Sequence, residues 1–114
     1  MEKKRIVISY GGYFEDFLIE QTPKEQVKIL QVLRLIEELD VIPANFLKHI
    51  EGTDGLYEVR VSFSRKAFRI FCCFYARFVV LLNAFLKKTQ KTPKEQIELA
   101  EMLMRKYKNE KSLS

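Results

Sequence analysis

Cysteine, histidine and long apolar runs are all scarce in this chain of 114 residues. The two cysteines, Cys72 and Cys73, are adjacent, and neighbours in a strand point to opposite faces, so they are poor partners for a disulfide. Together with one histidine, His49, they also lack the spacing of a zinc site. We therefore expect no metal and no cofactor, and we interpret both cysteines as small apolar residues of a buried strand.

No apolar stretch approaches the ~20 residues that a membrane-spanning helix needs. The longest stretch, 78–86, is interrupted by Asn83 and fits a buried strand. At the N-terminus a glutamate and three cations precede an apolar stretch that is too short for a secretory signal. A glycine-rich phosphate loop, a dinucleotide-binding pattern and a nucleophile elbow are also missing. We expect a cytoplasmic protein that does not bind membranes.

The net charge of +5 is unevenly distributed along the chain. Residues 1–54 carry seven Lys/Arg and ten Asp/Glu, whereas residues 55–114 carry thirteen Lys/Arg and five Asp/Glu. Such segregation indicates that the second half faces a polyanion. A solvated basic helix at the C-terminus would explain part of this excess, but it would not explain the cations inside predicted strands.

The spacing of apolar residues predicts a single α+β domain over residues 1–109 and a disordered tail over 110–114. The predicted strands cover 5–9, 56–63, 67–74 and 78–86, and the predicted helices cover 13–20, 22–40 and 93–108. The order is β-α-α-β-β-β-α, with a mainly antiparallel sheet and the helices packed on one face. The segment 42–55 shows no clear period.

The pentapeptide Thr-Pro-Lys-Glu-Gln occurs twice, at 22–26 and at 92–96. In each copy the threonine can cap a helix, the proline suits the first helical position and the glutamate can close a capping box. We expect the same N-terminal cap on both helices. The apolar stripe predicted for the first of these helices consists of Val27, Leu30, Leu33 and Ile36.

Two arginines, Arg60 and Arg69, stand in the middle of predicted strands. A guanidinium there is costly unless it reaches water, a carboxylate or a phosphate. Strand alternation allows both to share a face with Lys87 and the rings of Phe71 and Phe85. Cations for phosphates and flat rings for stacked bases are what single-stranded RNA binding requires.

Two simpler interpretations of these cations remain open. Arg60 can pair with Glu58 and serve structure alone, and Lys87 and Lys88 can be a solvated strand end. If the face instead cuts RNA by attack of the adjacent 2′-hydroxyl, a lysine of lowered pKa would transfer protons and the arginines would stabilise the pentavalent phosphate.

Three phrases of the sequence carry a resemblance to a known family: GTDGLYEVRV at 52–61, FRIFCCF at 68–74 and VVLLNAFLKKTQKTPKEQIELA at 79–100. From about Arg5 to Tyr107 the chain resembles the RelE/ParE toxin superfamily, and within it most closely the phage-derived HigB-like branch. The resemblance implies the toxin of a type II toxin–antitoxin system. Such a toxin cleaves messenger RNA in the ribosomal A site without a metal, and its partner is a cognate helix-turn-helix antitoxin.

The resemblance also assigns roles to individual residues. It implies catalytic roles for Arg60, Arg69, Lys87 and Lys88. The residues that it matches to RNA contact are Lys48, Phe85, Thr89 and Gln90. The superfamily also contains gyrase inhibitors that share the fold, so a ParE-like inhibitor of a topoisomerase and a non-catalytic RNA-binding relic remain as alternatives.

Overall fold

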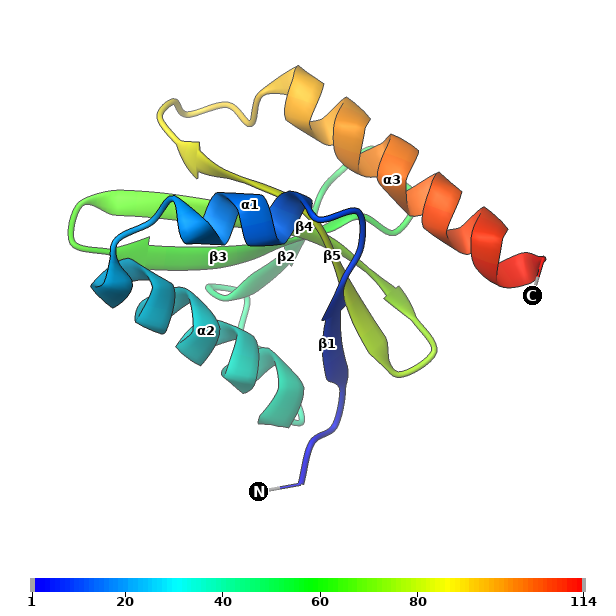
Figure 1. Cartoon of the computed structure of the whole chain (residues 1–114), viewed down its shortest axis with the longest axis horizontal. Coiled ribbons are helices and arrows are strands. Elements are labelled where there is room, and N and C mark those ends of the chain that lie inside the picture. The colour runs from blue at the N-terminus through cyan, green and yellow to red at the C-terminus, as the bar shows by residue number, and fades with distance from the viewer. Residues whose placement is uncertain (1, 114) are drawn as a thin grey trace.

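A computed structural model of the chain describes residues 2–113 as an α+β fold around one five-stranded sheet (Figure 1). The strands are β1 (Ile6–Ser9), β2 (Leu47–His49), β3 (Tyr57–Phe63), β4 (Lys66–Tyr75) and β5 (Phe78–Lys87), and the helices are α1 (Tyr13–Ile19), α2 (Pro23–Glu38) and α3 (Lys94–Ser112). The strand order in the sheet is β1-β5-β4-β3-β2. Among the strands of residues 2–113 only β1 pairs in parallel, with β5, so the expectation of a mainly antiparallel sheet is confirmed.

The short strand β2 was not predicted, so the observed order is β-α-α-β-β-β-β-α. It has three residues, of which Leu47 is half-buried while Lys48 and His49 are exposed. A strand this short shows no period in the sequence. It forms because it pairs along the edge of β3, where Leu47 lies opposite Val59.

The helices cover both faces of the sheet, which corrects the prediction that they pack on one face (Figure 1). On one face, α1 and α2 cover a buried cluster that includes Val59 and Ile70 of the sheet. On the other face, α3 covers a second cluster that includes Phe71 and Leu82. The reason is that β4 and β5 are apolar on both sides, so neither face can remain in contact with water.

Helix α2 begins with the predicted capping box, in which the Thr22 side chain accepts from the Glu25 backbone and the Glu25 carboxylate accepts from the Thr22 backbone. Its predicted apolar stripe is partly wrong, because Val27 and Leu30 are 55% and 49% exposed. The buried face instead consists of Glu25, Ile29, Val32, Leu33 and Ile36. Glu25 helps determine which face of the helix is buried, since its carboxylate is 2.8 Å from the Lys66 ammonium of β4.

Helix α3 does not use the second copy of the pentapeptide in the same way. Pro93 is its N-cap residue, and no side chain caps this end. The helix also continues to Ser112, so the expected disordered tail is helical over 110–112, and Ser114 lies outside the described residues. Within residues 2–113 the structure holds no helix with the length and apolarity to cross a membrane.

The β3–β4 and β4–β5 hairpins turn tightly although their loops contain no glycine, asparagine or aspartate. Ser64 joins β3 to β4 at a φ of 58°, and Ala76 joins β4 to β5 at a φ of 54°. Such left-handed conformations are what short hairpin loops require, even in residues that rarely adopt them. The strand pairing therefore imposes these turns against the local preference of the chain.

A bulge in β5 changes which face its side chains reach. The register with β4 shifts between Ile70 and Cys72, so two residues of β5, Leu82 and Asn83, together oppose Phe71. An inserted residue of this kind shifts every later residue of the strand by one position and so moves it to the other face.

The packing on each side of the bulge shows this reversal. Before it, Leu82 belongs to the cluster under α3. After it, Phe85 belongs to that same cluster, whereas Leu86 packs on the cluster under α1 and α2. Lys87, two residues beyond Phe85, therefore lies on the α3 side of the sheet, where simple alternation from Leu82 would not have placed it.

Candidate nucleic-acid interface

Four cations gather on the α3 side of the sheet, and we call Lys48, Arg60, Arg69 and Lys87 the cation face. The strand register places Arg60 of β3 opposite Arg69 of β4. Lys48 lies opposite Glu58, which is two residues from Arg60 and on the same side. Lys87 lies opposite Ala67, two residues from Arg69. Residues from four strands thus supply one positively charged surface.

The centre of the cation face is a carboxylate shared by two guanidiniums. Glu58 Oε2 is 3.3 Å from Arg60 Nε and 3.8 Å from Arg69 Nε. Glu58 and Arg69 are 6% and 8% exposed, and Arg69 Nη1 donates to the Phe68 carbonyl at 3.1 Å. The structural pairing of Arg60 with Glu58, which the sequence left open, is therefore present.

This pairing does not fully compensate the positive charge of the two arginines. A single carboxylate faces two guanidiniums, and the buried Nε atoms of Arg60 and Arg69 have no hydrogen-bond partner. Burial lowers the pKa of Arg69; the Glu58 charge opposes that shift and the Arg60 charge adds to it. A bound anion would supply the negative charge and the acceptors that this centre lacks.

Two neighbouring concavities flank this centre and share Lys87 and Gln90. The first, of about 440 Å³, is also lined by Arg69, Lys88 and Thr89. The second, of about 280 Å³, is lined further by Lys48, His49, Glu51, Glu58, Arg60 and Thr92. Seven of the eight residues predicted for the site therefore line these concavities, with Phe85 as the exception.

Phe85 is placed differently from the expectation that it stacks on a base. It is 9% exposed and packs edge-to-face against Phe71, with ring centroids 5.3 Å apart. It also lies opposite Arg69 in the register, so its side chain projects from the same side of the sheet, next to Arg69. Its ring is mostly covered by protein and leaves little surface for stacking on a base.

His49 lines the second concavity, but its ring is engaged elsewhere. It lies opposite Tyr57 in the register, and the two ring centroids are 5.2 Å apart. Its Nε2 is 3.2 Å from the Thr53 carbonyl oxygen. Lys48, by contrast, lies on the same side of the sheet as the arginines. Strand alternation therefore directs these two neighbouring side chains to opposite sides of the sheet.

The sequence-based site omitted Glu58, Glu51 and Thr92, which line the second concavity. Glu58 was considered only as a structural partner of Arg60, although the two-residue spacing places both side chains on one face of the strand. Glu51 and Thr92 stand in connecting segments whose approach to the sheet no local pattern indicates.

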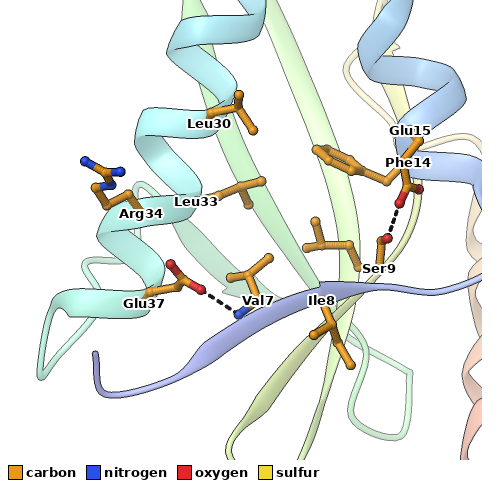
Figure 2. A pocket seen from close by; sticks show the side chains of 10 residues that line it. Val7, Ile8, Ser9, Phe14, Glu15, Leu30, Leu33, Arg34 and Glu37 are labelled. Carbon is orange, nitrogen blue, oxygen red and sulfur yellow. Dashed lines mark hydrogen bonds between the residues drawn. The ribbon is translucent and has the colours of Figure 1, made fainter. Parts of the chain in front are cut away.

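A concavity of about 480 Å³, larger than either concavity at the cation face, lies between β1, α1 and α2 on the other side of the molecule (Figure 2). Its polar groups bind one another: Ser9 donates to Glu15, and Glu37 accepts from the Val7 backbone at 2.8 Å. Arg34 is the one cation among its lining residues. This concavity therefore lacks the converging positive charge of the cation face.

The described residues 2–113 contain no group of three or more His, Cys, Asp or Glu side chains that could hold a metal ion. Both cysteines are free and buried, and burial raises the pKa of each thiol. They belong to the core, as predicted, and do not take part in the site.

A comparison with curated proteins found no match. The family model described as phage derived protein Gp49-like (DUF891) matches residues 16–105. The matched region includes α2, strands β2 to β5 with the whole cation face, and the first part of α3. The chain therefore belongs to the family of phage-derived Gp49-like proteins.

Proposed function

We propose that this protein is the toxin of a toxin–antitoxin system and acts as a ribosome-dependent endoribonuclease that cleaves messenger RNA in the A site. The observation that carries the proposal is the pair of arginines that share one buried carboxylate beside Lys87 and Lys88. The Gp49-like family and the resemblance to the HigB-like branch of the RelE/ParE superfamily support the same assignment.

In the proposed reaction, a phosphate of the RNA lies in the concavity lined by Arg69, Lys87 and Lys88. The neighbouring 2′-oxygen gives up its proton and bonds to phosphorus, while the bond to the 5′-oxygen of the next nucleotide breaks. The products are a 2′,3′-cyclic phosphate and a 5′-hydroxyl that has taken up a proton. Arg60 and Arg69 offset the charge that develops on the phosphate oxygens.

Proton transfer in this reaction falls to Lys87 or Lys88, because no histidine or free carboxylate lines the first concavity. Lys87 is half-buried and lines both concavities, whereas Lys88 is exposed. Thr89, Gln90 and Lys48 would contact the RNA on either side of the scissile phosphate. The ribosome would hold the strand in a bent geometry, a contribution from proximity that this small protein need not make itself.

The proposal includes a cytoplasmic location and a cognate antitoxin of the helix-turn-helix type. Both follow from the toxin assignment and the expected target. Neutralisation of toxicity in cells by the product of an adjacent reading frame would test the proposed antitoxin.

The proposal is tested by adding the purified protein to a defined translation reaction and mapping new 5′ ends of the messenger RNA, with and without ribosomes. We expect ends within codons at the A site that form only when ribosomes are present. If translation continues and no new ends form, the assignment as a nuclease is wrong. A loss of DNA supercoiling activity in a parallel topoisomerase assay would then favour a ParE-like inhibitor.

One observation favours RNA binding without cleavage as a second candidate. Both arginines contact Glu58, and Phe85 offers no face for a base, so the face could hold phosphates without the contacts that orient a scissile bond. This candidate predicts strong salt dependence of binding to single-stranded RNA and no new RNA ends.

A further inference from the structure

Asn83 is a buried polar side chain at the bulge of β5, with 2% of its surface exposed. Its Nδ2 donates to the Gln96 carbonyl oxygen at 3.0 Å and to Gln96 Oε1 at 2.9 Å. Its Oδ1 is buried and has no hydrogen-bond partner. Buried amides are rarely left half-satisfied, so the role of this one requires an explanation.

Asn83 and Gln96 lie on either side of the segment that connects β5 to α3, and this segment carries part of the site. Asn83 lies in β5 a few residues before Lys87, and Gln96 lies in the first turn of α3. Between them, residues 88–93 supply Lys88, Thr89 and Gln90 to the first concavity. The double hydrogen bond therefore fixes the distance that this connecting segment must span.

Apart from Ile97, which packs on the cluster under α3, the first turn of α3 has few other attachments to the rest of the fold. No side chain caps this end of the helix, and the Lys94–Glu98 ion pair is exposed and lies within the helix itself. Thr89 donates to the Lys91 carbonyl, a bond internal to the connecting segment. The amide of Asn83 thus links this turn directly to the sheet.

The bulge makes the position of Asn83 critical for Lys87. The extra residue moves Lys87 to the side of the sheet that holds Arg60 and Arg69. Asn83 is one of the two residues that oppose Phe71 there, and its bonds to Gln96 hold the side chain toward α3. These bonds would be lost if β5 returned to a regular register.

We propose that Asn83 is a positioning residue, which holds Lys87 and Lys88 beside Arg69 by tying the β5 bulge to the first turn of α3. It lines neither concavity of the site, so it acts through these lysines and not by contact with RNA. The consequence for reaction rate rests on the proposed function, whereas the consequence for the segment 88–93 does not.

The test compares the parent with Asn83→Ala and Asn83→Asp. The aspartate keeps the shape of the side chain, but it replaces the amide donor with an oxygen that faces the two acceptor oxygens of Gln96. Asn109→Ala, on the exposed surface of α3, is the control. Backbone hydrogen exchange is measured across the chain, and single-turnover cleavage on programmed ribosomes is measured for each variant and for Asn83→Ala combined with Lys87→Ala.

Both Asn83 variants should exchange faster in residues 88–93 and in the first turn of α3, with α1 and α2 unchanged. The cleavage rate constant should fall about tenfold or more while the affinity for the ribosome–mRNA complex changes less than about twofold. The slowing in the double variant should be smaller than the product of the two single slowings, because both changes remove the same contribution of Lys87.

Unchanged exchange in 88–93, or an additive effect with Lys87→Ala, would overturn the positioning role while the nuclease assignment stands. If the parent itself does not cleave RNA, the proposed function fails, and the exchange measurement alone decides the role of Asn83. If Asn83→Ala does not fold, Gln96→Ala removes the Oε1 acceptor and keeps the backbone acceptor, so it should give smaller changes of the same kind in exchange and in cleavage.

Discussion

Arg60 and Arg69 lie directly opposite one another in β3 and β4, and both approach the same carboxylate oxygen of Glu58. Like charges at opposed positions of neighbouring strands destabilise a sheet. The fold tolerates this pair because Glu58 is buried between them, but one negative charge is not enough for two positive ones. A face arranged in this way is stabilised when it binds an anion.

Replacement of Glu58 tests this balance of charge. Glu58→Gln should lower the free energy of unfolding by about 3 kcal/mol, since it leaves buried guanidinium charge without a counterion. Added sulfate should restore more stability to this variant than to the parent, because the anion binds only the folded face. Chemical denaturation with and without sulfate measures both effects. Glu51→Gln, an exposed neighbour, is the control, and an equal loss in the two variants would contradict the prediction.

The exposed lysines of the interface should determine the salt dependence of RNA binding. Lys48→Ala and Lys88→Ala should each reduce the slope of log affinity against log salt by about 0.7, the value for one phosphate contact on a single strand. Titration with a fluorescent oligonucleotide that lacks 2′-hydroxyls at the cleavage position measures this without turnover. Lys24→Ala, on the exposed surface of α2, should leave the slope unchanged. A slope that falls equally in all three variants would instead indicate a diffuse electrostatic attraction between the RNA and the whole protein surface.

Local patterns in the sequence predicted most of this fold. The capping box at Thr22, the three long strands and their apolar character are all encoded within short windows. The tight hairpin loops were weakly indicated, because Ser64 and Ala76 adopt left-handed conformations that the pairing of the strands imposes.

Other features depend on contacts that a local pattern does not contain. The helices lie on both faces because of apolar residues on both sides of β4 and β5, and the buried face of α2 follows from the contact between Glu25 and Lys66. The bulge places Lys87 on the cation face, and Phe85 is buried with little of its ring exposed. Both depend on the register between strands, which is set in three dimensions.

The two copies of the pentapeptide provide a matched test of helix capping. Thr22→Ala should lower the free energy of unfolding by about 1 kcal/mol, because the hydroxyl accepts from the Glu25 backbone. Thr92→Ala should lower it by less than about 0.5 kcal/mol, because no side chain caps α3. Urea denaturation of both variants measures the difference. Equal losses would show that Thr92 caps α3 in solution and that the described N-terminus is wrong.

Glu25 should make the folded state sensitive to acid. The hydrogen bond from Lys66, followed by those from Thr22, holds the pKa of Glu25 below its usual value of 4.5. A carboxyl whose pKa is lowered by folding contributes stability above its unfolded pKa and loses it as the pH falls through the folded value. From about pH 6 to about pH 3, the free energy of unfolding should therefore fall more steeply in the parent than in Glu25→Gln.

Lys66→Met should also fall less steeply in stability with acid than the parent, because Lys66 makes the largest contribution to the lowered pKa of Glu25. Denaturation across this pH series measures the slopes of all three proteins. Parallel slopes would mean that the contact between Glu25 and Lys66 does not persist in solution.

The most direct test of the central claim is a comparison of the parent with Arg69→Met in a ribosome-programmed translation reaction, with new mRNA 5′ ends quantified for each. Methionine fills the space of the buried guanidinium, so the variant should fold with unchanged or higher stability. We expect A-site ends from the parent and at least about a hundredfold slower cleavage from Arg69→Met, since a preorganised charge at the phosphate is lost. Equal cleavage by a well-folded Arg69→Met protein would show that the cation face is not the site of the reaction.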